Sequence, residues 1–316
     1  MLIAFATTVA YFRARAALDH AAIAGRSSSL PSTPVADLTR VACCQIAPRI
    51  GAAEANRAAG LAAARAAAIH GAAIVVLPEL SASGYVFRDV AEARSLAEPA
   101  DGPTAAGWAV LASRHDITIV GGVCELGGGG LLYNTAVAVD AGGVRAVYRK
   151  AHLWDAEKLV FTPGEDPPPV IETAGTSLAL MICYDLEFPE WVRLPALAGA
   201  HVLCVPANWP ALPRPDGERP IEVVRAQAAA STNRMFVAVC DRTGAERGVD
   251  WVGGSVIIDP DGWPLAGAGL DDQEITIAAD CDLASAADKR VSERNDVLTD
   301  RRPSLYGGVT TRDPDD

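Results

Sequence analysis

The sequence predicts an α/β fold in which sheets are covered on both faces by other layers. Short, apolar, β-rich runs alternate with Ala-rich helical stretches after about residue 40, and this alternation occurs in both halves of the chain. The predicted strands are apolar at nearly every position, which is typical of strands buried on both faces. Half of the 316 residues are apolar and 21% are charged, so the chain can form a large core and is not disordered.

In the first half, the pattern predicts a strand over Val41–Pro48 and a helix over Ala52–His70. The helix is followed by Gly71, which tolerates the left-handed conformation common after helix ends. An Asp-Ala-Gly-Gly sequence at residues 140–143 suits a β-hairpin turn. The other elements predicted here are a helix at Thr104–His115 and strands at Ala73–Leu80, Ile117–Leu126, Tyr133–Asp140 and Val144–Lys150.

The second half repeats this alternation. Pro189 stands in the first turn of a predicted helix that runs to Gly199, and Pro is tolerated at that position. A second helix is predicted over Arg219–Asn233. The predicted strands of this half are Thr176–Cys183, His201–Asn208, Phe236–Asp241, Gly254–Asp259 and Glu274–Asp282.

Both ends of the chain are expected to lie outside the main α/β domain, which is predicted over residues 39–285. Residues 1–38 are predicted to be a non-catalytic extension, because the apolar run Met1–Phe12 is shorter than the ~20 residues of a membrane span. Positive charges follow this run, whereas they precede it in a secretory signal. Export stays the alternative, since Ala-Arg-Ala at residues 14–16 has the form of a cleavage site. Residues 286–316 are expected to be a tail, extended from Arg301 onward and able to pack on a partner subunit.

The charge of the chain excludes some classes of partner. Lys and Arg number 27 against 39 Asp and Glu, which gives a net charge of −12 at pH 7. Such an acidic surface repels phosphate backbones and anionic lipids. We therefore expect a small-molecule substrate, with no nucleic-acid partner and no membrane partner.

The cysteines and glycines indicate neither a metal nor a cofactor. No CxxC pair and no Cys/His cluster with zinc spacing occurs, so buried free thiols in a reducing cytoplasm are expected. The run Gly127–Gly130 lacks the Lys-Ser/Thr and the following helix of a phosphate-binding loop, and a hairpin loop is predicted instead. The seven cysteines are Cys43, Cys44, Cys124, Cys183, Cys204, Cys240 and Cys281.

Three residues with useful chemistry stand at the ends of predicted strands. Glu79 ends an apolar strand, and the carboxyl ends of strands are where α/β sheets place their functional groups. Lys150 ends another strand and has apolar and aromatic neighbours on both sides, which favours a buried ammonium. Cys183 ends a strand before a loop and a helix, which exposes a nucleophile and directs backbone N–H groups toward developing negative charge.

The chemical roles of these three side chains are complementary. A thiol becomes a strong nucleophile when a base removes its proton, and a carboxylate in a dry site can do this because burial raises its pKa. A neighbouring ammonium can stabilise the resulting oxyanion. The set therefore predicts acyl transfer at a cysteine that needs no metal and no cofactor. His152, which stands among apolar residues, is interpreted as a hydrogen-bonded structural group, with direct chemistry as the alternative.

The chain resembles the nitrilase (carbon–nitrogen hydrolase) superfamily from about Thr39 to about Leu283. The resemblance is carried by LPEL around Glu79, YRKAHLW around Lys150 and MICYDLEFPE around Cys183, in the family's order. It implies a four-layer αββα sandwich and assembly into homodimers or larger homo-oligomers. Further familial features are Arg225 and the runs at 208–210, 241–244, 254–255 and 259–262.

The resemblance also implies roles for individual residues. Glu79 is expected to be the general base, Lys150 the oxyanion stabiliser and Cys183 the nucleophile. Glu157 precedes the sequence Phe-Thr-Pro-Gly and matches a second family glutamate, which is implied to orient Lys150 or the substrate amide. Its alternative is a solvent-facing charge paired with Lys158.

The expected substrate is a small carboxamide, hydrolysed to a carboxylic acid and ammonia through a cysteine thioester. True nitrilases of the superfamily tend to carry Trp-Glu after the cysteine, whereas this chain has Tyr184-Asp185, which resembles the amidase branches. The next Arg after Cys183 is Arg193, so a substrate carboxylate has no nearby partner, and burying it would be costly. A neutral or amine-bearing primary amide is favoured. The residues expected at the substrate are Tyr85, Tyr184 and Trp209 as pocket walls, and Glu187 for a substrate ammonium.

Two other functions stay open. An N-carbamoyl amine hydrolase or a nitrilase of the same superfamily would use the same residues, and an N-carbamoyl substrate would release carbon dioxide together with ammonia. A non-catalytic binding or assembly protein that keeps the fold is the more remote alternative. The intact set of Glu79, Lys150, Cys183 and Glu157 argues against it.

Overall fold

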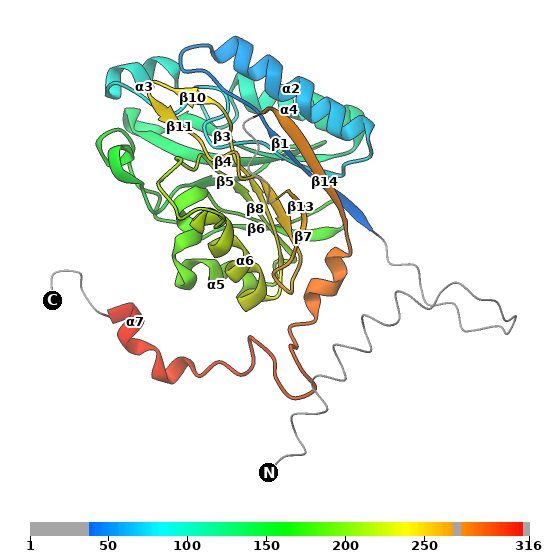
Figure 1. Cartoon of the computed structure of the whole chain (residues 1–316). Helices are drawn as coiled ribbons and strands as arrows, with labels where there is room; N and C mark the ends of the chain where they lie inside the picture. The colour runs from blue at the N-terminus through cyan, green and yellow to red at the C-terminus, as the bar shows by residue number, and fades with distance from the viewer. Residues whose placement is uncertain (1–37, 268–272, 312–316) are drawn as a thin grey trace, which may run out of the picture. The chain divides into compact units, whose positions relative to one another are not determined.

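The computed structural model describes residues 38–267 and 273–311. The predicted N-terminal extension therefore lies, apart from its last residue, outside the described residues. The described chain forms two six-stranded sheets with helices, a mixed α/β architecture (Figure 1).

The first sheet has the strand order β14–β1–β2–β3–β4–β5. Its centre is parallel, because β2 pairs in parallel with both β1 and β3, whereas the outer pairs are antiparallel. The strands are β1 (Thr39–Gln45), β2 (Ile74–Val76), β3 (Thr118–Leu126), β4 (Leu132–Asp140), β5 (Gly143–Arg149) and β14 (Ile275–Cys281).

The second sheet has the order β13–β12–β9–β8–β7–β6 and the same plan. Strands β7, β8 and β9 are parallel, and the outer strands pair antiparallel with them. The strands are β6 (Val170–Thr173), β7 (Thr176–Leu180), β8 (Val202–Pro206), β9 (Phe236–Cys240), β12 (Val256–Ile258) and β13 (Pro264–Gly267).

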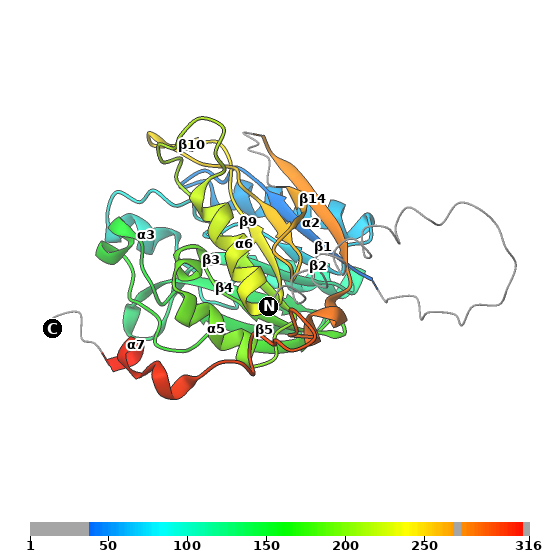
Figure 2. The ribbon, with the colours of Figure 1, turned by 60° about the horizontal axis from the view of Figure 1, so that its bottom comes forward.

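Helices cover the outer face of each sheet, so the layers follow the order helix, sheet, sheet, helix (Figures 1 and 2). This arrangement agrees with the αββα sandwich expected from the sequence. Helices α2 and α4 cover the first sheet, and α5 and α6 cover the second. Their bounds are α2 (Ala53–Ile69), α4 (Pro103–His115), α5 (Pro189–Leu197) and α6 (Ile221–Asn233).

Strand β1 shows why the strands are apolar at nearly every position. Val41 and Cys43 lie in the core that the two sheets share, while Ala42 and Cys44 lie in a separate core with residues of α2 and α4. Successive side chains of a strand point to opposite faces, and here both faces are buried. The apolar run therefore follows from the four-layer stacking.

Several predicted strands end earlier than expected, and two of them precede candidate catalytic residues. Strand β2 ends at Val76 because Pro78 has no N–H to continue the ladder and Leu80 has a positive φ of 49°. Strand β7 ends at Leu180, and the chain turns at Cys183, whose φ is 45°. Because these two strands end early, Glu79 and Cys183 lie in loops outside the regular sheets.

The structure also contains elements that the pattern did not predict. Strand β6 is short and half exposed, so it lacks the apolar run used for the prediction. The tail was expected to be extended from Arg301, but it contains two short helical segments instead. The remaining elements are α3 (Val90–Leu96), β10 (Ala245–Glu246), β11 (Val249–Asp250), η1 (Gly128–Gly130), η4 (Leu283–Ala287), η5 (Pro303–Leu305) and α7 (Gly307–Thr311).

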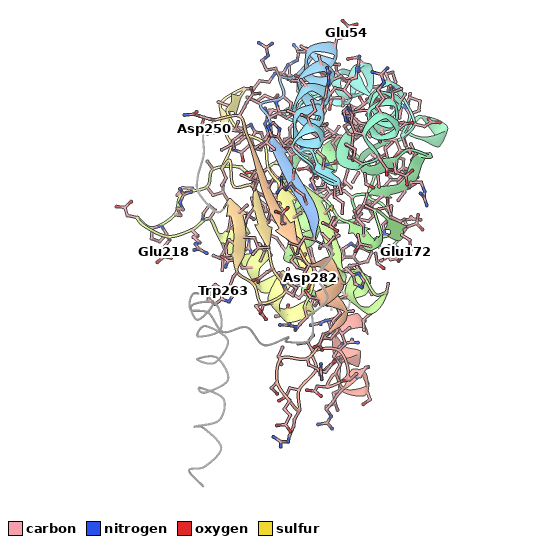
Figure 3. The ribbon with its side chains drawn as sticks, turned by 90° about the vertical axis from the view of Figure 1, so that its right-hand side faces the viewer. Glu54, Glu172, Glu218, Asp250, Trp263 and Asp282 are labelled. Carbon is pink, nitrogen blue, oxygen red and sulfur yellow. The ribbon has the colours of Figure 1, made fainter. Side chains whose placement is uncertain are left out.

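The acidic surface is spread over the molecule. Glu54, Glu172 and Glu218 are exposed and lie on different sides (Figure 3). All seven cysteines are buried, and none forms a disulfide. Within the described ranges, no helix is long and apolar enough to cross a membrane.

Candidate active site

Three loop segments bring one ammonium and two carboxylates together. Glu79 lies in the loop after β2, Lys150 directly follows β5, and Glu157 lies in the short helix η2 (Asp155–Leu159). Lys150 Nζ donates to Glu79 Oε1 at 2.7 Å and to Glu157 Oε1 at 2.8 Å. All three side chains are buried, so Glu157 is no solvent-facing charge and belongs to a buried ionic cluster with the other two.

Gly122 in β3 allows the Glu79 loop to pack against the sheet. A Cβ atom at Gly122 would lie 2.4 Å from the Leu80 nitrogen and 2.6 Å from the Glu79 Cα, which is too close for any side chain. The backbone N–H of Gly122 donates to the Pro78 carbonyl at 3.0 Å, and its carbonyl accepts from Ser81. The absence of a side chain at this position therefore places the Glu79 carboxylate over the sheet.

Asn134 joins this cluster and was not predicted. Its Nδ2 donates to Glu79 Oε1 at 2.6 Å and lies 3.3 Å from Glu157 Oε1. Asn134 is fully buried within the mostly apolar strand β4. A polar residue in the middle of such a strand was the sequence signal that could have identified it, since buried amides need partners.

Cys183 begins the turn η3 (Cys183–Glu187) at the end of the second sheet's β7. Its positive φ is sparsely populated for a residue with a Cβ, and such strain is typical of functional turns. Asn208 connects this turn with the first sheet. The Cys183 Sγ lies 3.8 Å from the Asn208 carbonyl oxygen, and Asn208 Nδ2 donates to the Glu79 carbonyl at 2.9 Å.

The electrostatic environment of the cluster gives the Glu79 carboxylate a pKa that suits a base near neutral pH. Burial raises the pKa of Glu79 to about 7, although the charge of Lys150 opposes the shift. Burial lowers the pKa of Lys150, but Glu157 and Glu79 together raise it above its ordinary value, so the ammonium stays charged. Burial and the charge of Glu79 raise the pKa of Cys183, so the thiol rests protonated until a base takes its proton.

Unsatisfied buried atoms concentrate at this site. Among the described residues, six buried side-chain nitrogen or oxygen atoms have no hydrogen-bond partner, and three of them belong to this cluster. They are Glu79 Oε2, Asn134 Oδ1 and Asn208 Oδ1. Native proteins leave few such atoms unpaired, and functional sites are a common reason when they do. All three can accept hydrogen bonds, which suits a substrate or water that donates them.

A buried carboxylate ties the Lys150 segment to the Cys183 turn. Asp185 Oδ2 accepts from the Tyr148 hydroxyl at 2.7 Å and from the Ile182 N–H at 3.3 Å. Its Oδ1 accepts from the backbone N–H of His152 at 3.0 Å and lies 2.7 Å from His152 Nδ1. The predicted interpretation of His152 as a hydrogen-bonded structural group agrees with these contacts and with its stacking on Phe188.

The three residues predicted as pocket walls lie in different environments. The Tyr85 hydroxyl donates to Glu157 Oε1 at 2.6 Å, so this residue contacts the catalytic candidates directly. The half-buried Tyr184 packs edge-on against Trp154. Trp209 is buried, and its backbone N–H donates to the buried Asp241 carboxylate at 2.9 Å.

Glu187, predicted to meet a substrate ammonium, has a partner in the protein. Arg225 of α6 forms an ion pair with it at 2.8 Å. The sequence interval gave no sign of this partner, because α6 reaches the turn only through the packing of α5 and α6 on the sheet. Across the described ranges, no group of three or more His, Cys, Asp or Glu side chains could hold a metal ion.

Comparison of the sequence with known proteins identifies the family to which it is similar. The sequence profile of the carbon–nitrogen hydrolases matches residues 40–291. A nitrilase of Pyrococcus abyssi is 34% identical over 272 residues, 85% of this chain and 99% of that protein. A 2-oxoglutaramate amidase of Bacillus subtilis is 37% identical over 237 residues, covering 74% of this chain and 86% of that protein.

Solved structures point the same way. A variant of the amidase from Nesterenkonia sp. AN1, with the acetamide moiety of fluoroacetamide covalently added at its active-site cysteine, matches with a TM-score of 0.71. It is 28% identical, and the match covers 89% of this chain and 99% of that one. The fold, the extent of the match and the amidases among its relatives agree, and the chain belongs to the carbon–nitrogen hydrolase family, in the amidase-like branch of the nitrilase superfamily.

Proposed function

We propose that this enzyme hydrolyses a small carboxamide to a carboxylic acid and ammonia through a thioester on Cys183. The proposal rests on the buried cluster of Glu79, Lys150 and Glu157, which Asn208 links to the strained Cys183 turn. The cysteine adduct of the Nesterenkonia amidase supports it, because that relative forms a covalent bond at its own active-site cysteine.

In the proposed first half-reaction, Glu79 takes the proton of the Cys183 thiol, and the thiolate attacks the amide carbon. Lys150 and the backbone N–H of Tyr184 stabilise the oxyanion, a role in which preorganised donors contribute strongly. The C–N bond then breaks, and the leaving nitrogen takes the proton from Glu79 and departs as ammonia. An acyl thioester on Cys183 is left.

In the second half-reaction, Glu79 takes a proton from water, and the resulting hydroxide attacks the thioester carbon. The C–S bond breaks, the acid leaves, and the proton returns to Cys183. Glu157 contributes by accepting a hydrogen bond from the Lys150 ammonium, with Tyr85 and the Trp154 N–H fixing its carboxylate. Glu157 is therefore proposed to act on the reaction through Lys150.

Ammonia release from a panel of aliphatic, aromatic and amino-acid amides tests this function, with a ureide and a nitrile included. We expect turnover of amides and an acyl adduct on the Cys183 peptide by mass spectrometry. Cys183→Ala should remove both signals, whereas the control Cys204→Ala, at another buried thiol, should keep them. Release of carbon dioxide with the ammonia would favour the N-carbamoyl alternative. No turnover of any compound, together with no labelling of Cys183 by iodoacetamide, would favour a non-catalytic protein.

The pH dependence of kcat/KM should report the base. Because Glu79 must be ionised to accept the thiol proton and its pKa lies at about 7, activity should rise with pH to a plateau above 7. Below that value the rate should fall about tenfold per pH unit. Burial also raises the pKa of Asp241 to about 7, so the control is Asp241→Asn, which should keep the rising limb even if the loss of a backbone hydrogen bond lowers the rate itself. A profile that is flat between pH 5 and 8 would contradict Glu79 as the base.

A further inference from the structure

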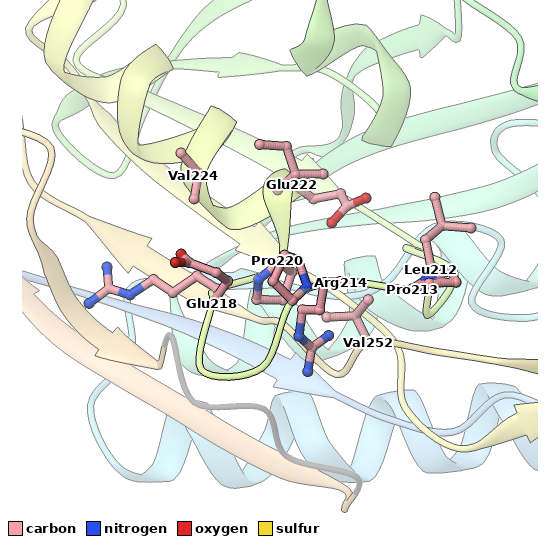
Figure 4. A pocket seen from close by; sticks show the side chains of 11 residues that line it. Leu212, Pro213, Arg214, Glu218, Pro220, Glu222, Val224 and Val252 are labelled. Atoms are coloured by element: carbon pink, nitrogen blue, oxygen red, sulfur yellow. The ribbon is translucent and has the colours of Figure 1, made fainter.

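A cavity of about 380 Å³ is lined by 11 residues that precede or follow the start of α6 (Figure 4). It lies between the loop that follows β8, the first turn of α6 and Val252. Its charged lining residues come from that loop and from α6. The residues used below are Arg214, Glu218, Arg219, Glu222 and Val252.

Two contacts place this cavity next to the catalytic candidates. The backbone N–H of Val252 donates to the Trp209 carbonyl at 2.9 Å, and Trp209 follows Asn208, which contacts Cys183. On the other side, Arg225 of α6 pairs with Glu187, the last residue of the Cys183 turn. These contacts connect the walls of the cavity to the residues next to Cys183.

Glu222 is the unusual residue of the lining. It is only 8% exposed, and no described residue forms a hydrogen bond or an ion pair with its side chain, while its carboxylate oxygens are reachable from the cavity that it lines. Arg225 lies three positions later on the same face of α6, but it already pairs with Glu187. The three side chains therefore carry one uncompensated negative charge. A carboxylate at a helix start is favoured by the helix dipole, and one that lines a cavity can accept hydrogen bonds from a ligand there.

The other charges of the cavity do not compensate Glu222. Arg214, Glu218 and Arg219 all lie on the exposed part of the loop. Arg219 donates to the side chain of Gln227 at 2.7 Å instead. Exposed charges are screened by solvent and contribute little to binding, so the buried carboxylate sets the preference of this cavity.

We propose that Glu222 binds a positively charged group of the substrate, so that the preferred substrate is a carboxamide that also carries a protonated amine. This inference rests on the proposed amide hydrolysis and names its substrate class. The ammonium would complete the charge balance of Glu187, Arg225 and Glu222 and would donate hydrogen bonds to the unpaired carboxylate. It also reassigns the ammonium contact, predicted at Glu187, to a residue that has no partner of its own.

Matched substrate pairs test the proposal. Aminoalkanamides (3-aminopropanamide, 4-aminobutanamide and 5-aminopentanamide) are compared with butanamide, pentanamide and hexanamide, in which a methyl group replaces the ammonium. The enzyme should prefer the amine-bearing member of at least one pair. Glu222→Gln should lower kcat/KM for that substrate by about tenfold or more, since one partner of a buried charge pair is lost, and change the neutral one by less than about twofold. The control Glu218→Gln should leave both values unchanged.

Several outcomes would overturn this subsite. They are equal loss on both members of a pair, no loss on either, or a preference for an amide that carries a carboxylate, which would indicate Arg214 instead. In each case hydrolysis of the neutral amides continues, so the proposed function stands alone. If neither series is hydrolysed, the proposed function fails as well. If the Glu222→Gln variant does not fold, the subsite can be tested on the unmodified enzyme. Butylammonium should then slow the labelling of Cys183 by iodoacetamide, and pentanol should not. Equal effects of the two compounds would contradict the subsite.

Discussion

Replacing Lys150 with Met is expected to remove measurable amide hydrolysis, with a loss of at least ~10²–10³ in kcat, the usual effect of losing one oxyanion donor. Methionine keeps much of the length of the side chain but has no charge and no N–H. The variant would leave Glu79 and Glu157 without the cation that lies 2.7–2.8 Å from both. Ammonia release at saturating substrate is the measurement.

The Lys150→Met variant should also be less stable, and the direction in which its stability changes with pH can be checked. Breaking a buried ion pair by removing one partner costs about 3–5 kcal/mol. Without the charge of Lys150, which opposes the raised pKa of the buried Glu79, that pKa should rise further above its unfolded value, so the folded state would favour the protonated form of Glu79. Stability should therefore be lost as the pH rises through the folded pKa, and the drop in Tm should be larger at pH 8 than at pH 6.

Lys158→Met is the matched control for Lys150→Met. Lys158 stands next to Glu157 but is exposed, so its replacement should change neither kcat nor Tm appreciably. If Lys150→Met kept its turnover and its Tm, the ionic cluster would have neither the catalytic nor the structural importance assigned to it.

The second large effect is expected for Asp185→Asn, at a residue that positions catalytic groups. Asp185 offers only acceptors to its partners: Oδ1 faces the N–H of His152, and Oδ2 faces the N–H of Ile182. An amide places one NH₂ group at either position, so one backbone N–H must lose its acceptor in either orientation. These two N–H groups stand two residues after Lys150 and one residue before Cys183, which come from different sheets.

Misplacing the Lys150 segment relative to Cys183 should lower kcat by roughly 10² with little change in KM, because a shift of about 1 Å has such an effect. Asp155→Asn, at an exposed position whose φ of 41° suits Asn, is the control. Assays at 20 °C, combined with thermal unfolding, separate positioning from a general loss of stability. A fall in Tm with kcat and KM unchanged would show that Asp185 stabilises the fold without positioning the catalytic groups.

The sequence was sufficient for much of this account because several signals are local. Apolar runs predicted the central strands, since side chains buried on both faces leave no polar position. Strand ends pointed to Glu79, Lys150 and Cys183, because a regular ladder stops where a loop must present a side chain. The resemblance added Glu157, which the structure places 2.8 Å from Lys150.

Other features depend on pairs of residues that are distant in the sequence. Glu79 contacts Asn208 across 129 positions, Asp185 meets His152 across 33, and Arg225 reaches Glu187 only through the packing of α6. Spacing along the chain cannot show such partners.

What the sequence determined by itself is the set of local conformations, and with it the chemical groups available at each strand end. What only the tertiary structure decided is which of those groups share one buried space and which carboxylate, Glu222, is left without a partner. The physical reason is that hydrogen bonds and ion pairs depend on distances of about 3 Å between atoms, which are set only when the two sheets stack and exclude water.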